Sequence, residues 1–143
     1  MKRSEIREII FMLLFRAEFN EVAEMPEQMQ LYFNVDLGIE AEGEEGEFAI
    51  PDSDREYIVA RESAILERLP EIDAKISEKA TGWTIDRMGK VDLAIIRLAV
   101  YEILFDEDIP VGVSINEAVE LAKKYGRDES GSFVNGVLAK FAK

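Results

Sequence analysis

The 143-residue sequence contains no cysteine and no histidine. Without cysteine the chain has no disulfides, thiolate metal sites or cysteine nucleophiles, a composition that fits a reducing cytosol. Without histidine it lacks the most common general base and the most common metal ligand. Any enzyme mechanism would have to use carboxylates, serines, lysines or tyrosines, so the composition makes catalysis less expected. We expect no cofactor and no metal ion.

Long hydrophobic runs are also missing. The longest strongly apolar run, residues 9–15, is far shorter than the roughly 20 residues that a membrane-spanning helix needs. Lys2 and Arg3 are not followed by a signal-peptide pattern with a small-residue cleavage site. The sequence therefore predicts a soluble cytoplasmic protein with no membrane partner.

The formal net charge of -13 argues at first against binding to nucleic acid, because phosphates are bound by clustered lysine and arginine. The acids are concentrated, however, since residues 17–56 carry 13 acids against Arg55 alone. Both ends are basic: residues 1–16 carry four bases against two acids, and residues 123–143 carry five against two. If the ends met in space, they would form one modest positive patch on an acidic body.

Helical periodicity dominates the chain, and no alternating strand of useful length occurs, which predicts an all-α fold. The first helix, from Ile6, is apolar almost all round, so it is either central in a bundle or covered by a partner. Residues 25–37 allow a short second helix, and residues 40–54, within the acidic segment 40–56, read as a loop. Residues 89–105 form the most apolar long segment and predict the core helix.

Local signals predict where the other helices begin and end. Two capping boxes, Ser53 with Glu56 and Ser114 with Glu117, each predict a helix start. Pro70 is placed at a permitted helix start, and that helix should run to about Ala80, before Thr81 and Gly82 break the pattern. Gly126 is a natural end for the helix that follows Ser114.

Asn135 and Gly136 form a dipeptide that is typical of hairpin turns between alternating strands. The flanking apolar residues have helical spacing instead: Phe133, Val134, Val137, Leu138 and Phe141. We therefore place the dipeptide inside a final helix. Because a helical glycine costs about 1 kcal/mol relative to alanine, we expect Gly136 to allow close approach of another backbone.

Several stretches resemble the NusB family of bacterial transcription antitermination factors: VDLAIIRLAVYEILF, DEDIPVGVSINEAVELAKKYG, DESGSFVNGVLAK and, for the amino-terminal helix, MKRSEIREIIFMLLF. The resemblance implies a compact all-α bundle of about seven helices without catalysis. It implies one RNA-binding domain over residues 1–143, with two three-helix-type subdomains of about residues 1–80 and 81–143. It also implies binding to boxA-type leader RNA of ribosomal RNA operons, together with the ribosomal protein NusE, in an RNA polymerase antitermination complex.

The resemblance also implies roles for individual residues. Matching positions for RNA contacts are Lys2, Arg3, Arg7, Glu129, Ser130 and Phe133. The cations would contact phosphates, Glu129 and Ser130 would lie beside the bases, and Phe133 would offer a stacking face worth about 1 to 3 kcal/mol per base. Phe15 and Asp92 match positions of the NusE interface.

Simpler roles remain open for these residues. Phe133 is equally compatible with the core, Arg3 and Arg7 with solvated helix positions, and Asp92 with stabilisation of a helix start. Lys123, Lys124 and Arg127 either extend the basic patch or complement a helix end. The alternative function is a protein-only interaction module, or a homodimer that masks the RNA surface. A hydrolase with paired carboxylates has no motif behind it.

Overall fold

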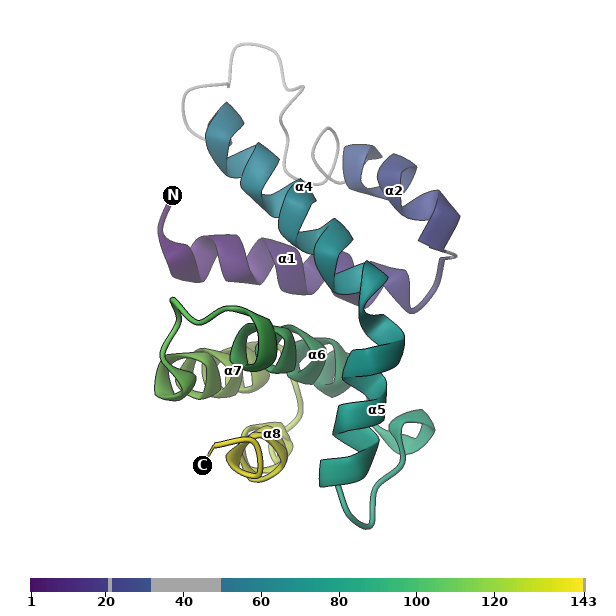
Figure 1. Ribbon diagram of the computed structural model, residues 1–143, viewed down its shortest axis with the longest axis vertical. Helices are drawn as coiled ribbons and strands as arrows, with labels where there is room; N and C mark the ends of the chain where they lie inside the picture. Colours follow the sequence, from purple (N-terminus) through teal and green to yellow (C-terminus); the bar gives the residue numbers. More distant parts are fainter. Residues whose placement is uncertain (21, 32–49, 143) are drawn as a thin grey trace. The chain divides into compact units, whose positions relative to one another are not determined.

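The computed structural model describes residues 1–20, 22–31 and 50–142, which form helices joined by loops (Figure 1). These ranges contain no strand, so the prediction of an all-α fold is confirmed. None of their helices is long and apolar enough to cross a membrane. The chain divides into two compact units, Met1–Leu66 and Glu67–Lys143. This boundary precedes the one expected near residue 80, because the helix after residue 68 packs within the second unit.

The first unit contains α1 (Arg3–Ala17), a 3-10 helix (Val22–Glu24), α2 (Met25–Leu31) and α4 (Asp52–Glu67). Its apolar interior comes from all three α-helices: Ile10, Phe11, Leu13, Leu14, Met25, Met29, Ile58 and Ile65. The short second helix is confirmed as far as Leu31. Residues 32–37 of that prediction, and residues 40–49 of the acidic segment, lie outside the described residues.

The start of α4 differs from the prediction. The helix begins at Asp52, one residue before Ser53, so Ser53 is inside the first turn and does not cap it. The reason is local: the carbonyl of Pro51 already accepts a hydrogen bond from the N–H of Arg55 at 2.9 Å, which closes a helical turn earlier than the capping pattern indicated.

Two buried residues of the first unit are charged or polar among those described, Arg7 and Glu62. Glu62 on α4 has no exposed surface, and neither carboxylate oxygen has a hydrogen-bond partner among the described residues. Burial raises the pKa of Glu62 from 4.5 to about 8, because an ionised carboxylate loses its hydration there. This carboxyl is therefore largely protonated at neutral pH in the folded protein.

The second unit contains α5 (Leu69–Lys79), a 3-10 helix (Ile85–Arg87), α6 (Lys90–Phe105), α7 (Val111–Tyr125) and α8 (Ser130–Ala139). The apolar helix α6 packs against α5, α7 and α8, as predicted for the core helix (Figure 1). Its buried apolar side chains include Leu93, Ile95, Ile96, Leu98 and Val100. Pro70 lies in the first turn of α5, a permitted place for proline as predicted, and the break at Thr81 and Gly82 is also confirmed.

Polar pairs join the helices of this unit. Arg97 on α6 donates two hydrogen bonds to Asp73 on α5, at 2.9 and 2.8 Å, in the paired geometry that suits a guanidinium and a carboxylate. Ser114 corrects a prediction, because α7 begins at Val111 and Ser114 is inside the helix. It is buried, and its hydroxyl donates to Glu102 on α6 at 2.8 Å rather than capping α7.

Candidate nucleic-acid interface

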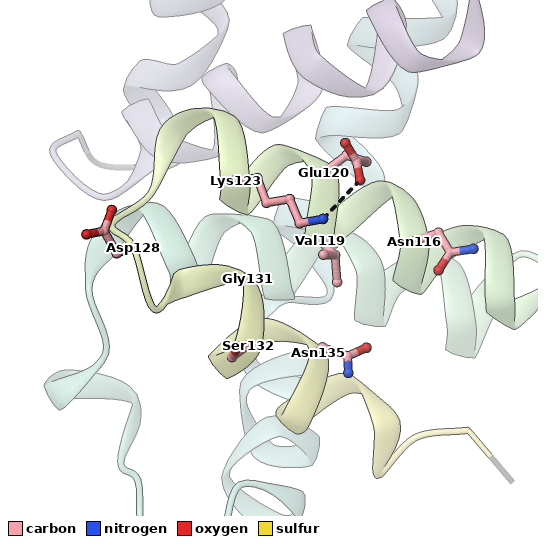
Figure 2. A pocket seen from close by; sticks show the side chains of 8 residues that line it. All are labelled: Asn116, Val119, Glu120, Lys123, Asp128, Gly131, Ser132 and Asn135. Atoms are coloured by element: carbon pink, nitrogen blue, oxygen red, sulfur yellow. Dashed lines mark ion pairs between the residues drawn. The ribbon is translucent and has the colours of Figure 1, made fainter.

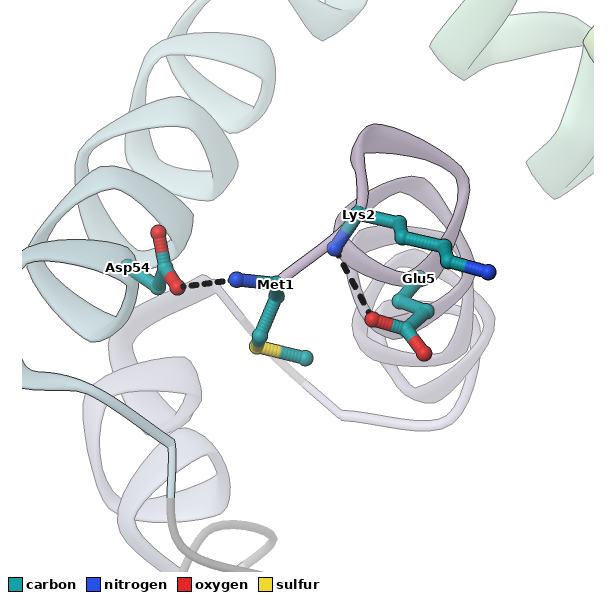
Figure 3. Close-up of polar contacts among 4 residues, drawn as sticks. All are labelled: Met1, Lys2, Glu5 and Asp54. Atoms are coloured by element: carbon teal, nitrogen blue, oxygen red, sulfur yellow. Dashed lines mark hydrogen bonds and ion pairs between the residues drawn. The ribbon is translucent and has the colours of Figure 1, made fainter.

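The amino-terminal cations lie at the first turn of α1. Lys2 and Arg3 are exposed, and the backbone N–H of Lys2 donates to Glu5 Oε1 at 2.9 Å, which satisfies one free donor of the helix end. The Met1 ammonium pairs with Asp54 on α4 at 3.0 Å. Figure 3 shows the Lys2 side chain extending away from Asp54. This arrangement presents cations that a phosphate can reach.

Arg7 is positioned differently from Lys2 and Arg3. Only 8% of its surface is exposed. It shares a helix face with Ile10 and Leu14, three and seven residues further along, and both of these are buried. The spacing in the sequence was the signal that Arg7 belongs to this inner face. Arg7 is therefore much less accessible to a phosphate than Lys2 and Arg3.

The second group of predicted residues lies at the start of α8. Glu129 is exposed and Phe133, one helical turn later, is half-buried. Ser130 is only 2% exposed, and its Oγ accepts a hydrogen bond from the N–H of Arg127 at 2.9 Å. Ser130 therefore positions the loop before α8 and offers no exposed atom to a base in this conformation.

Gly126 precedes this loop and ends α7, as the sequence predicted. Its φ of -93° is available to any residue, so conformational freedom is not the reason for glycine. A Cβ at this position would lie 2.5 Å from Cβ and Oγ of Ser130, which no real side chain tolerates. Glycine is required here because the start of α8 folds back so closely on the end of α7.

A polar groove runs between α7 and α8 beside these residues (Figure 2). Its volume is about 610 Å³, and its polar lining comprises Asn116, Glu120, Lys123, Asp128, Ser132 and Asn135. Lys123 pairs with Glu120 at 3.7 Å, but both side chains remain mostly exposed. The groove offers amide, hydroxyl and charged groups next to the Glu129 end of α8, a combination suited to hydrogen bonding with base edges.

The structure contradicts the prediction that Gly136 allows close approach of another backbone. Asn135 and Gly136 do lie inside α8, as predicted. However, Gly136 is exposed, and a Cβ built on it meets no atom of the described residues within 4 Å. Close packing against another backbone within the chain therefore does not explain this glycine.

The two residues predicted to meet NusE fall in different units. Phe15 on α1 is half-buried, and its ring makes an edge contact with the exposed Phe19, with centroids 5.2 Å apart. Asp92, in the first turn of α6, is half-buried and lies close to Gly89, which caps the helix start. The position of Asp92 is favourable for the helix dipole whether or not a partner binds.

The predicted RNA residues also divide between the units, with the three cations in the first and Glu129, Ser130 and Phe133 in the second. Sequence reasoning missed Trp83, whose ring contacts Phe133 with centroids 5.1 Å apart. The available signal was that it is the only tryptophan of the chain and follows the Thr81–Gly82 break. Among the described residues, no cluster of three or more acids could hold a metal ion.

Comparison with known proteins relates this geometry to a family. The sequence model that describes the NusB family matches residues 4–143 of this chain. The chain belongs to the NusB family. It is 59% identical to a transcription antitermination protein NusB of Agathobacter rectalis, over 99% of this chain and all of the relative. It is 50% identical to the NusB protein of Lachnoclostridium phytofermentans, over 98% of both chains.

Solved structures of the family have the same fold. NusB of T. maritima superposes with a TM-score of 0.79 at 32% identity, covering 99% of this chain and 91% of that one. NusB of Aquifex aeolicus superposes with a TM-score of 0.72 at 27% identity, covering 97% and 86%. Family membership confirms the resemblance seen in the sequence, and it also confirms that the protein is not an enzyme.

Proposed function

We propose that this protein is a transcription antitermination factor that binds boxA-type leader RNA of ribosomal RNA operons together with NusE. In this role it acts in the bacterial cytoplasm, as part of a complex that makes RNA polymerase resistant to termination. The observation that carries the proposal is the family match over residues 4–143, supported by relatives named as transcription antitermination proteins.

The chemistry of the two residue groups supports a division of labour in RNA binding. Lys2 and Arg3 supply charge that neutralises phosphates without reading sequence. Glu129 supplies a carboxylate that can accept hydrogen bonds from base amino groups, and Phe133 supplies a ring against which a base can stack. Ser130 is buried and holds the loop before α8 through its hydrogen bond with Arg127, and Arg7 is buried in the first unit.

The NusE part of the proposal concerns Phe15 and Asp92. Phe15 near the end of α1 and the exposed Phe19 just beyond it form an apolar patch that a protein partner can cover. The same patch favours the alternative of a homodimer that masks the RNA surface. The alternative predicts self-association that falls when RNA or NusE is added, whereas the proposal predicts a complex that contains all three components.

The test is a titration of single-stranded boxA-type RNA with and without purified NusE, at about 50 and about 200 mM salt. We expect affinity that rises when NusE is present and falls steeply with salt, because phosphate contacts release counterions. A scrambled RNA of the same length is the control for sequence preference. The absence of binding at low salt, with or without NusE, would reject the proposal.

A further inference from the structure

Trp83 stands in the turn between α5 and the 3-10 helix at Ile85–Arg87, and 52% of its surface is exposed. It is the only tryptophan in the chain. Burial of an indole stabilises a fold in proportion to the apolar area removed from water, and here about half of that area stays in water. A purely structural role therefore accounts for only part of this side chain.

The turn that carries Trp83 is held in place at several points. The backbone N–H of Trp83 donates to the backbone carbonyl of Ala80 at 3.1 Å. Gly82 adopts a φ of +87°, which glycine accepts without steric cost. Lys140, at the end of α8, donates to the Thr81 hydroxyl at 2.8 Å. The ring of Trp83 meets that of Phe133 at 67°. The indole is thus already oriented before any ligand arrives.

Trp83 lies beside one face of α8 that carries an acid, an aromatic ring, a glycine and a lysine. Residues 129, 133, 136 and 140 are spaced by four, three and four, so they share this face: Glu129, Phe133, Gly136 and Lys140. Trp83 contacts the second of these and the Thr81 hydroxyl binds the fourth. Gly136, between them, leaves open space where any other residue would place a side chain.

Cations lie near the carboxyl-terminal end of this face. Lys140 is exposed, and the Lys79 ammonium lies over the Phe141 ring, 6.0 Å from its centroid. An exposed aromatic ring, a position without a side chain and nearby cations match what an unpaired nucleotide requires: a stacking surface for the base and room and charge for the sugar and phosphate.

We propose that Trp83 is an RNA-binding residue that stacks with an unpaired base, with Phe133 holding the indole and the RNA backbone passing over Gly136 towards Lys140. This inference rests on the proposed function and adds a residue to the α8 half of its site. The ligand is single-stranded RNA, because the base faces of a duplex are already stacked on one another.

The test uses the fluorescence of Trp83, which reports on this site alone because the chain has no other tryptophan. In one measurement, single-stranded boxA-type RNA carrying a dye is mixed with the whole protein, and binding is followed by dye anisotropy. In a second, unlabelled RNA of the same sequence is titrated into the protein, and the emission of Trp83 is recorded. We expect emission to fall along the same binding curve. We also expect Trp83→Ala to weaken binding about tenfold and Trp83→Phe to recover most of that loss.

Controls separate stacking from loss of structure or charge. Tyr57→Ala removes another exposed aromatic ring, on α4, and should leave RNA affinity within twofold. Trp83→Ala should weaken binding equally at low and high salt, because no phosphate contact is removed. Gly136→Gln should weaken binding about fivefold, whereas Ala139→Gln, an exposed change of similar size on α8, should not. Far-ultraviolet circular dichroism checks that each variant is folded.

The outcomes distinguish this inference from the proposed function. RNA that binds by anisotropy without changing tryptophan emission, and with unchanged affinity for Trp83→Ala, overturns the stacking role and leaves the proposed function intact. Emission that responds to NusE but not to RNA also overturns it, because Trp83 would then contact protein. If wild-type protein binds no RNA under any condition, the proposed function fails and this inference fails with it.

Discussion

Where RNA binding is proposed, the first unit presents exposed cations at the start of α1, and the second presents an acid and two aromatic rings beside α8. The two units also treat buried acids differently. Glu62 in the first unit has no hydrogen-bond partner among the described residues, whereas Glu102 in the second accepts a hydrogen bond from Ser114. The second unit thus pairs its buried polar groups Arg97, Glu102 and Ser114.

The difference teaches how affinity and selectivity can be divided in an acidic protein. Charge attracts any RNA and is screened by salt, while stacking and base-edge contacts depend on rings and carboxylates that are held in one orientation. Two cations on α1 supply the first property, and the Glu129–Phe133 turn with Trp83 supplies the second.

The largest effect concerns the unpartnered acid of the first unit. The pKa of Glu62 in the folded protein is about 8, against 4.5 for an ordinary glutamate. As pH rises, the carboxyl therefore loses its proton at a lower pH in the unfolded chain than in the folded protein. Between pH 4.5 and 8 the unfolded state therefore holds fewer protons, and stability falls as pH rises. Relative to Glu62→Gln, the wild type should lose about 4 kcal/mol of unfolding free energy across this window.

Urea denaturation at pH 5, 6.5 and 8 measures that loss. Glu56→Gln, an exposed change on the same helix, is the matched control and should follow the wild-type pH profile. Identical profiles for wild type and Glu62→Gln would show that Glu62 is hydrated or paired in solution, and the contrast with Glu102 would disappear.

The second effect concerns the paired groups of the second unit. Arg97→Ala removes both hydrogen bonds to Asp73 between α5 and α6, and it leaves a carboxylate whose side chain is only 27% exposed. We expect a loss of about 2 kcal/mol in unfolding free energy at pH 7, from denaturant titration. Lys75→Ala breaks an exposed pair with Glu78 and should cost about 0.5 kcal/mol or less. Equal losses for the two variants would contradict the prediction.

The third effect concerns the cations of α1. Lys2→Ala with Arg3→Ala should weaken RNA binding about tenfold at 50 mM salt and reduce the salt-dependence slope by about 1.4. Arg68→Ala with Lys75→Ala removes the same charge from two exposed positions elsewhere and should change neither quantity much. If the control pair had the larger effect, the binding surface would lie in the second unit alone.

The smallest effect concerns Gly136. Because its position in α8 is exposed and open, Gly136→Ala should stabilise the protein by about 0.5 to 1 kcal/mol through its helix propensity. Thermal unfolding followed by circular dichroism would show the gain as a higher Tm. A stabilised variant with weaker RNA binding would mean that glycine is kept for the ligand, and a destabilised one would point to a packing role within the chain.

Sequence patterns predicted the helices well where their signals are local. The helical spacing around Asn135 and Gly136 outweighed a dipeptide typical of turns, and Pro70 and Gly126 marked true helix boundaries. Capping patterns were less reliable, since Ser53 and Ser114 both lie inside helices. Of the two residues in the motif that suggested a helix start, Ser114 donates a hydrogen bond to Glu102 on α6 instead.

The candidate site was only partly predictable for the same reason. Lys2, Arg3, Glu129 and Phe133 were found by resemblance and are at least partly exposed. Arg7 and Ser130 matched the same motifs but are buried, which depends on the packing of whole helix faces. Trp83 belongs to no motif used here, and only the fold places it against a ring fifty positions away.

The sequence by itself determined the all-α class, most helix positions, the segregation of charge and the family, because periodicity, composition and motif order are properties of neighbours along the chain. The tertiary structure decided which polar groups are buried, that Arg97 pairs with Asp73, and that Trp83 stands over Phe133. Those outcomes depend on contacts between residues distant in sequence, and no local pattern encodes the distance between them.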